Sequence, residues 1–270
     1  MLRTGRFVTT MALAGLAFLY IPILLMMILS FNGSRLVSVW GGFSTKWYGE
    51  LLSNDQLLNA AWLSVKVAAF SATLAVVLGT LAGYVLTRFG PFRGRVMMAG
   101  IATAPLVMPE VITGLALLLL FVAMEDFVGW PQGRSLTTIV IAHATFCMAY
   151  VTIVVQSRLA QMDGVLEEAA QDLGARPWRA FVDVTLPMLA PALISGWLLA
   201  FTLSFDDLII ASFVSGPGSS TLPMVIFSKV RLGVSPDVNA LATILIGFVG
   251  TCVFAYSWRV GRRLRQRDAV

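Results

Sequence analysis

The chain has 270 residues, of which 58% are apolar and only 12% are charged. Soluble domains carry about one quarter charged residues, so this composition excludes a large water-soluble domain. The net charge is +5, and Cys147 and Cys252 both lie in apolar runs, so neither a disulfide framework nor a metal site is expected.

The apolar residues gather into six runs, each near the length of about 20 residues that a helix needs to cross the hydrocarbon core. In chain order they lie at 7–31, 60–86, 97–124, 137–157, 189–214 and 239–258. The first run is too long for the apolar part of a signal peptide, and no cleavage site follows it, so we expect a retained span. The pattern predicts an all-α integral membrane protein, with residues 1–270 forming one domain of six transmembrane helices.

The distribution of basic residues along the chain agrees with this topology. If the N-terminus is cytoplasmic, thirteen Arg residues fall in cytoplasmic segments, five basic residues fall in outer loops, and Lys66 lies in the second run. This positive-inside bias predicts that both termini are cytoplasmic. A nucleic-acid site would instead need the charges together on one soluble face.

The longest polar interruption on the predicted cytoplasmic side is residues 158–188. A short helix is expected there that stops at Gly174, because glycine favours the left-handed helix terminus, and Pro177 suits the first turn of a second helix. One face of the first helix is small and apolar, made by residues at three- and four-residue spacing: Leu166, Ala169, Ala170 and Leu173. Helices that lie on membranes favour Lys and Arg, whereas this one is acidic, so docking to a partner is the preferred interpretation.

The spacing within this segment is specific. Glu168-Ala169-Ala170 is followed after three residues by Gly174, and after nine more by Val184, one residue and Leu186-Pro187. This resembles the EAA loop of type I ABC importer permeases, with Val184 where Ile is common. The resemblance implies a type I permease fold in a bacterial inner membrane, with coupling helices that dock onto separate ATPase subunits. The residues expected in ATPase coupling are Glu167, Glu168, Ala169, Ala170, Gly174, Leu186 and Pro187.

The chain is not expected to be an enzyme, and no catalytic residues are assigned. A P-loop needs a lysine between glycine and Ser or Thr, and Lys46, Lys66 and Lys229 all lack that context. ATP and Mg would therefore be bound by the partner ATPase subunits.

Three carboxylates lie within predicted spans, where ionisable side chains are costly and usually functional. Glu110 follows two prolines in the third run, about 13 residues and so roughly 20 Å from its inner end. Asp206 and Asp207 lie toward the outer part of the fifth run. Because neighbouring residues on a helix point about 100° apart, only one aspartate is expected to face a narrow path. An ion pair between Glu110 and Lys66 remains open as an alternative.

These carboxylates would attract cations and repel anions along a path through the protein. Phe201 and Phe205 precede the aspartates and could hold ammonium groups by cation–π attraction, although packing is the commoner role of such rings. The expected substrate path therefore consists of Glu110, Asp206, Asp207, Phe201 and Phe205. His143, the only histidine, is expected to be a hydrogen-bonded core residue.

Three segments resemble the polyamine permeases within the importer family, most closely those for putrescine: 104–114, 201–218 and 239–243. The resemblance implies import of putrescine, or of spermidine, from periplasm to cytoplasm. It also implies a heterodimer with a paralogous permease, two ATPase subunits and a periplasmic polyamine-binding protein. A proton-coupled secondary transporter of organic cations is the alternative, but such proteins often contain internal repeats, and none is evident here.

Overall fold

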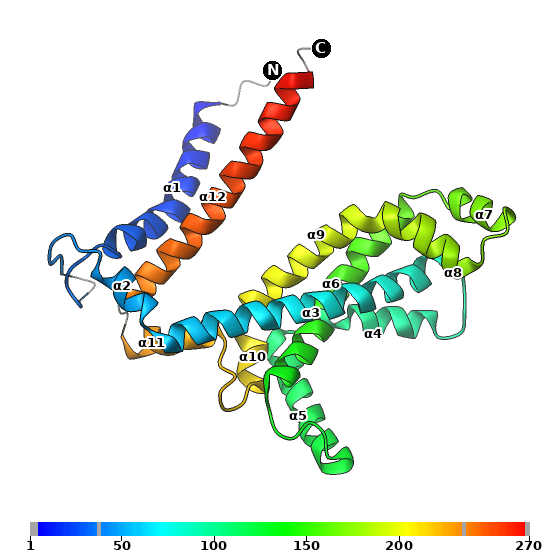
Figure 1. Ribbon diagram of the computed structural model, residues 1–270, viewed down its shortest axis with the longest axis horizontal. Helices are drawn as coiled ribbons and strands as arrows, with labels where there is room; N and C mark the ends of the chain where they lie inside the picture. Colours follow the sequence, from blue (N-terminus) through cyan, green and yellow to red (C-terminus); the bar gives the residue numbers. More distant parts are fainter. Residues whose placement is uncertain (1–4, 37–38, 234–235, 268–270) are drawn as a thin grey trace. The chain divides into compact units, whose positions relative to one another are not determined.

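The structure is a computed structural model that describes residues 5–36, 39–233 and 236–267 (Figure 1). The chain ends, including Arg3, lie outside the described residues. Six helices within the described ranges are long and apolar enough to cross a membrane. They are Phe7–Leu29, Asp55–Arg88, Glu110–Val128, Leu136–Ala160, Pro177–Phe205 and Pro236–Arg259. The prediction of an all-α protein with six transmembrane helices is confirmed.

The contacts divide the chain into two compact units. One unit joins the two ends of the sequence, Met1–Leu58 and Ile226–Val270. In it, α12 (Pro236–Arg267) contacts both α1 (Arg6–Leu29) and α2 (Lys46–Leu52). Part of α11 (Leu222–Leu232) also belongs to this unit.

The loop between α1 and α2 is organised by Asn32. The Asn32 amide donates a hydrogen bond to the Val39 carbonyl at 2.8 Å, and its Oδ1 accepts one from the Gly41 N–H at 2.7 Å. The Trp47 indole N–H donates to the Asn32 carbonyl at 2.6 Å. These bonds hold the polar backbone of the loop against the start of α2.

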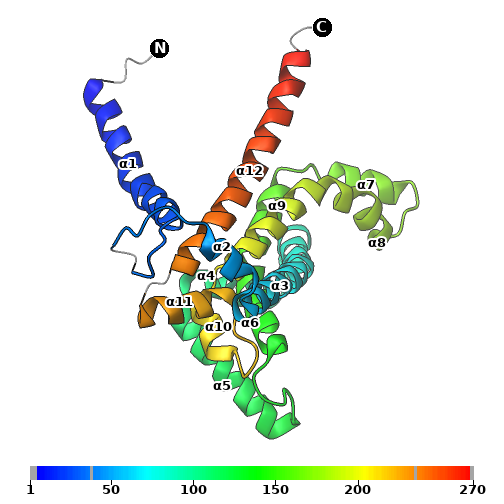
Figure 2. The same ribbon diagram turned by 60° about the vertical axis from the view of Figure 1, so that its left-hand side comes forward.

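The other unit, Asn59–Val225, contains most of α3 (Asp55–Arg88) and the remaining helices. In chain order these are α4 (Arg95–Val107), α5 (Glu110–Val128), α6 (Leu136–Ala160), α7 (Val165–Asp172), α8 (Pro177–Ala180), the π-helix η1 (Phe181–Thr185), α9 (Leu186–Phe205) and α10 (Ile209–Val214). The hairpin of α7 and α8 projects beyond the ends of α6 and α9 (Figure 2).

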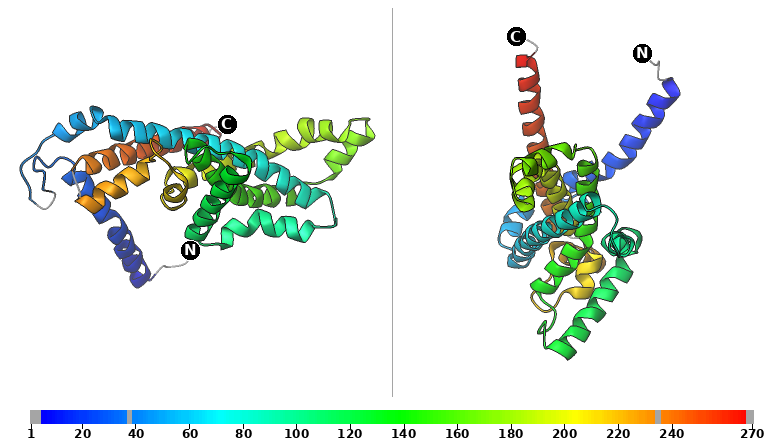
Figure 3. Two further views of the ribbon diagram at one scale, coloured as in Figure 1. Left: turned by 90° about the horizontal axis from the view of Figure 1, so that it is seen from below. Right: turned by 90° about the vertical axis from the view of Figure 1, so that its right-hand side faces the viewer.

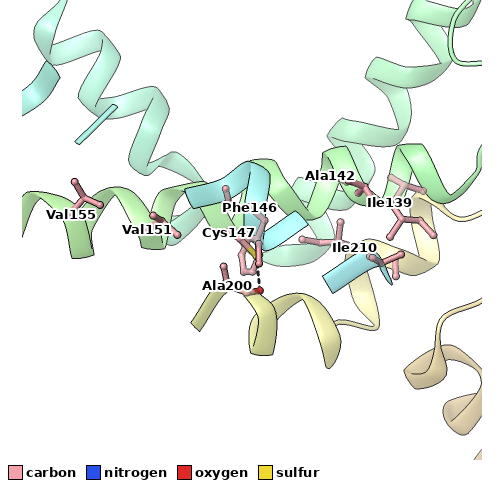
Figure 4. Packing of buried hydrophobic residues seen from close by; sticks show 14 of the residues in the cluster. Ile139, Ala142, Phe146, Cys147, Val151, Val155, Ala200 and Ile210 are labelled. Carbon is pink, nitrogen blue, oxygen red and sulfur yellow. Dashed lines mark hydrogen bonds between the residues drawn. The ribbon is translucent and has the colours of Figure 1, made fainter. Parts of the chain in front are cut away.

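The core of this unit is built around α6, of which 67% is buried over its most apolar stretch. Phe146, Cys147 and Val151 of α6 lie among fully or nearly fully buried side chains, with Ala200 of α9 and Ile210 of α10 beside them (Figure 4). Several helices of the same unit therefore cover α6, and the side chains of the candidate site lie on helices that pack against it.

Two glycines let α3 approach α6 closely. A Cβ atom at Gly79 would lie 2.8 Å from the Val151 Cβ, and one at Gly83 would lie 2.9 Å from the Val155 Cγ1. Real Cβ contacts are longer than this, so the two helices can pack at this distance only because glycine has no side chain.

The third apolar run, expected as one helix over 97–124, is broken. The α4 helix ends at Val107, Met108 is extended, and α5 begins at Glu110 after Pro109. The two helices run in different directions (Figure 1 and Figure 3). Proline lacks the N–H that a continuing helix needs, and it disfavours helical backbone in the residue before it.

The fifth run, expected as one helix over 189–214, is also broken. The α9 helix ends at Phe205, and α10 begins at Ile209, with Asp206 and Asp207 between them. The Asp207 Oδ1 accepts a hydrogen bond from the Ala211 N–H at 2.9 Å. Such a side-chain bond to nearby backbone gives the chain an alternative to continuous helix.

Candidate functional site

The two aspartates at the α9–α10 break lie in different surroundings. Asp206 is exposed, whereas Asp207 is only 8% exposed. The two side chains differ in exposure at a break in the helix, and not because of the 100° step between neighbours on a continuous helix. Asp207 points into the protein, where its Oδ1 accepts the Ala211 N–H.

His143 of α6 links the two sides of this break. Its Nδ1 lies 2.7 Å from the Ser204 hydroxyl, at the end of α9. Its Nε2 lies 3.3 Å from the Asp207 Oδ1, close but without the alignment of a hydrogen bond. The ring is 1% exposed, so the prediction of a hydrogen-bonded core histidine is confirmed.

Glu110 lies at the first position of α5, and it is exposed. A carboxylate at this position interacts favourably with the positive end of the helix dipole. Among the residues that the structure describes, no ion pair joins Glu110 and Lys66; the Lys66 Nζ lies 5.2 Å from the centre of the Trp62 ring. The alternative of a Glu110–Lys66 pair is therefore not supported.

The two helix breaks adjoin each other. One turn after Glu110, a Cβ atom at Gly114 would lie 2.8 Å from the Phe213 ring and 3.3 Å from the Ile210 Cα of α10. The start of α5 is thus packed directly on α10. Three acidic side chains expected on the substrate path are therefore gathered in one region.

Three aromatic rings stack along one face of α9 and lead toward this region. The ring centres of Phe201 and Phe205 are 5.9 Å apart, and those of Trp197 and Phe201 are 5.2 Å apart. The Trp197 indole N–H donates to the Thr73 hydroxyl of α3 at 3.1 Å. Trp197 was not among the expected residues; its four-residue spacing before Phe201 is the signal that could have found it.

The hairpin between α6 and α9 has the expected local structure. The α7 helix ends just before Gly174, whose φ is +90°, and Pro177 occupies the first turn of α8. The Ala175 N–H bonds to the Ala170 carbonyl at 3.0 Å and closes the helix end. Beyond it lies a hollow of about 600 Å³, lined by Leu173, Gly174, Ala175, Arg176, Trp178, Arg179 and Asp183.

The residues expected in ATPase coupling differ in their exposure and in the helix that carries them. Glu168, Ala169 and Gly174 are exposed, and Ala170 is partly exposed. Leu166 and Leu173, at the ends of the small apolar face, are 47% and 90% exposed. Leu186 and Pro187 form the first turn of α9.

Glu167 differs from these residues, because it is 8% exposed and turned toward α3. Its Oε1 lies 3.2 Å from the Arg88 Nε, and its Oε2 accepts a hydrogen bond from the Tyr84 hydroxyl at 3.3 Å. Helical spacing places Glu167 and Glu168 on different faces, but it does not say which of them contacts another helix.

The fold is that of known importer permeases. Over 96% of this chain and 98% of the other, it matches a chain from a bacterial ABC transporter involved in the import of the acidic polysaccharide alginate, with a TM-score of 0.71 and 17% identity. A chain of the MetNI methionine ABC transporter matches with a TM-score of 0.60 and 17% identity, over 76% of this chain and 94% of that chain.

Sequence comparison is more specific. Residues 75–266 match the family described as the inner membrane component of binding-protein-dependent transport systems. The putrescine transport system permease protein PotI of Escherichia coli (strain K12) is 58% identical over 255 residues, covering 94% of this chain and 91% of the relative. The spermidine/putrescine transport system permease protein PotC of the same strain is 43% identical over 230 residues, covering 85% and 84%.

These matches define a membrane component of an ABC transporter, which is not itself catalytic and crosses the inner membrane several times. The chain belongs to the inner-membrane permease family of binding-protein-dependent transport systems, on its polyamine branch.

Proposed function

We propose that this chain is a permease subunit that moves putrescine or spermidine from the periplasm to the cytoplasm. The observation that carries the proposal is the group of exposed carboxylates at two adjoining helix breaks, Glu110 and Asp206. A linear diamine carries two positive charges at neutral pH, because amines of this kind remain protonated. Two separate carboxylates attract such a substrate more strongly than they attract an anion or a neutral sugar. The identity to a putrescine permease supports this choice.

The residues have different roles in the proposed path. Asp206 and Glu110 face the cation, while Phe201 and Phe205 offer ring faces that hold an ammonium group by cation–π attraction. Asp207 acts indirectly: it is buried, accepts the Ala211 N–H, and so holds the break that exposes Asp206. Asp206 thus contacts the substrate, whereas the neighbouring Asp207 stabilises the backbone of the break.

The energy source in this proposal is a pair of separate ATPase subunits, which bind ATP and Mg. The exposed small apolar face of α7, with Glu168, Ala169, Ala170 and Gly174, is the surface that docks onto an ATPase from the cytoplasm. Both termini are then cytoplasmic as well. A paralogous permease completes the pathway as a heterodimer, and a periplasmic polyamine-binding protein delivers the substrate.

The proposal is tested by uptake of radiolabelled putrescine into liposomes that contain the complete complex with its periplasmic face outward. The putrescine-loaded binding protein is added to the outer solution. Uptake is expected to need ATP on the ATPase side, and no proton gradient. Uptake that persists without ATP and follows an imposed proton gradient would support the secondary transporter instead.

A matched pair of variants tests the site. Asp206→Asn is expected to lower uptake strongly, because it removes an exposed charge at the break, while the complex still assembles. Asp126→Asn is the control, since Asp126 is also an exposed aspartate but lies at the far end of α5. Equal uptake by both variants would remove Asp206 from the path.

A further inference from the structure

The end of α3 contacts the α7–α8 hairpin through a cluster of four side chains, the α3 clamp: Tyr84, Arg88, Glu167 and Phe181. Arg88 and Tyr84 lie one turn apart on α3, and each contacts a different oxygen of the Glu167 carboxylate, at 3.2 Å and 3.3 Å. One acidic side chain of α7 is therefore held by two groups of the second predicted span.

The clamp also reaches the second arm of the hairpin. The Tyr84 ring meets the Phe181 ring of η1 edge to face, with centres 4.8 Å apart and planes at 67°. The Arg88 Nη2 donates to the Met162 carbonyl, in the turn that follows α6, at 3.3 Å. A single turn of α3 thus contacts the turn before the hairpin, the first arm of the hairpin and its second arm.

Glu167 and its neighbour Glu168 differ in burial. The Glu167 side chain is 11% exposed and the Arg88 side chain 20%, whereas Glu168 is exposed. Charge-assisted hydrogen bonds are the stronger kind, and screening by salt is weaker for a partly buried pair. Glu168 can meet another protein, but Glu167 is already engaged within its own chain.

We propose that the α3 clamp transmits the movement of the docked hairpin to the second span, so that Glu167 is a positioning residue for coupling and not a docking contact. The proposal rests on the proposed function, in which an ATPase moves the hairpin. A displacement of α7 pulls on α3 through Glu167, and α3 carries it to α6 through the close packing at Gly79 and Gly83. Without the clamp, the hairpin moves with the ATPase while α3 stays behind.

The test uses the complete transporter in liposomes and compares Glu167→Gln, Arg88→Gln and the charge exchange Arg88→Glu/Glu167→Arg. Three quantities are measured: copurification of the ATPase, the rate of ATP hydrolysis, and putrescine taken up per ATP hydrolysed. Both single variants are expected to keep the ATPase bound and hydrolysing. Uptake per ATP is expected to fall roughly fivefold or more, the lower end of ordinary allosteric coupling. The charge exchange is expected to restore most of the uptake per ATP.

Two further variants sharpen the result. Tyr84→Phe keeps the ring against Phe181 but removes the hydroxyl that contacts Glu167, so a smaller loss of uptake per ATP is expected. Arg93→Gln is the control, because Arg93 is an exposed arginine on the loop that follows α3. It is expected to behave as the wild type.

Three outcomes would overturn the proposal. One is unchanged uptake per ATP in both single variants, and another is a charge exchange that is no better than either of them. The third is loss of the ATPase from the Glu167→Gln complex, which would make Glu167 a docking contact. The wild-type complex separates this proposal from the one on which it rests, since absence of ATP-driven uptake there contradicts the proposed function itself.

Discussion

His143 offers the most direct test of how the α9–α10 break is held. The variant His143→Leu keeps a side chain of similar size but removes both ring nitrogens. The Ser204 hydroxyl loses its 2.7 Å partner, and the buried Asp207 carboxylate loses its neighbour at 3.3 Å. One lost hydrogen bond removes about 1 kcal/mol, and a buried polar group left without a partner costs about 1–3 kcal/mol more.

The free energy of unfolding is therefore expected to fall by about 2–4 kcal/mol in His143→Leu. At roughly 2–4 °C per kcal/mol for a chain of this size, the midpoint of thermal unfolding should fall by roughly 4–16 °C. The measurement is thermal unfolding of the purified protein in detergent, followed by tryptophan fluorescence. Uptake should fall as well, because the break that exposes Asp206 loses its support.

A double-mutant cycle identifies the contact responsible. Ser204→Ala removes the other partner of the Nδ1 bond, so the double variant should cost less than the sum of the two single variants. Strict additivity would show that the two side chains do not interact. A midpoint shift below about 2 °C for His143→Leu would refute the reasoning as a whole.

Two other variants test close packing, and a third tests a hydrogen bond. Gly83→Ala should destabilise the protein by about 1–3 kcal/mol, because its Cβ would lie 2.9 Å from the Val155 side chain, and Val155→Ala in the same chain should restore most of the thermal stability. Gly216→Ala should lower thermal stability and expression strongly, since its Cβ would lie 1.9 Å from the Arg134 carbonyl oxygen; wild-type behaviour would contradict that backbone contact. Trp47→Phe removes a 2.6 Å hydrogen bond to a buried carbonyl and should cost about 1–3 kcal/mol, measured as a fall in the thermal midpoint; no shift would show that the carbonyl finds another partner.

Local sequence signals predicted the elements that depend on local chemistry. Hydropathy located the six helices, since the length of an apolar run is set by the thickness of the bilayer. Gly174 and Pro177 marked the two halves of the hairpin, because a left-handed residue and a fixed φ act within a single turn of chain. Pro109 is a local signal for the break before Glu110, whereas the length of the apolar run is that of one continuous helix.

The remaining features depend on contacts between residues that are distant in sequence. No proline lies at the α9–α10 break, where Asp207 caps α10 and His143, from another helix, lies beside it. Likewise, spacing on α7 gives Glu167 and Glu168 different directions, but only the position of Arg88 decides which of them is engaged. These choices follow from tertiary packing, which no local pattern contains.

The helix breaks also constrain where solvent goes. The first turn of a helix leaves N–H groups without hydrogen-bond partners, and the last turn leaves carbonyl oxygens without them. Hydrocarbon cannot satisfy either kind of group, so a chain interrupted at depth must surround them with protein or admit water. In the proposed path, a dication that arrives at Asp206 would then keep part of its hydration shell, and the protein need replace only the rest.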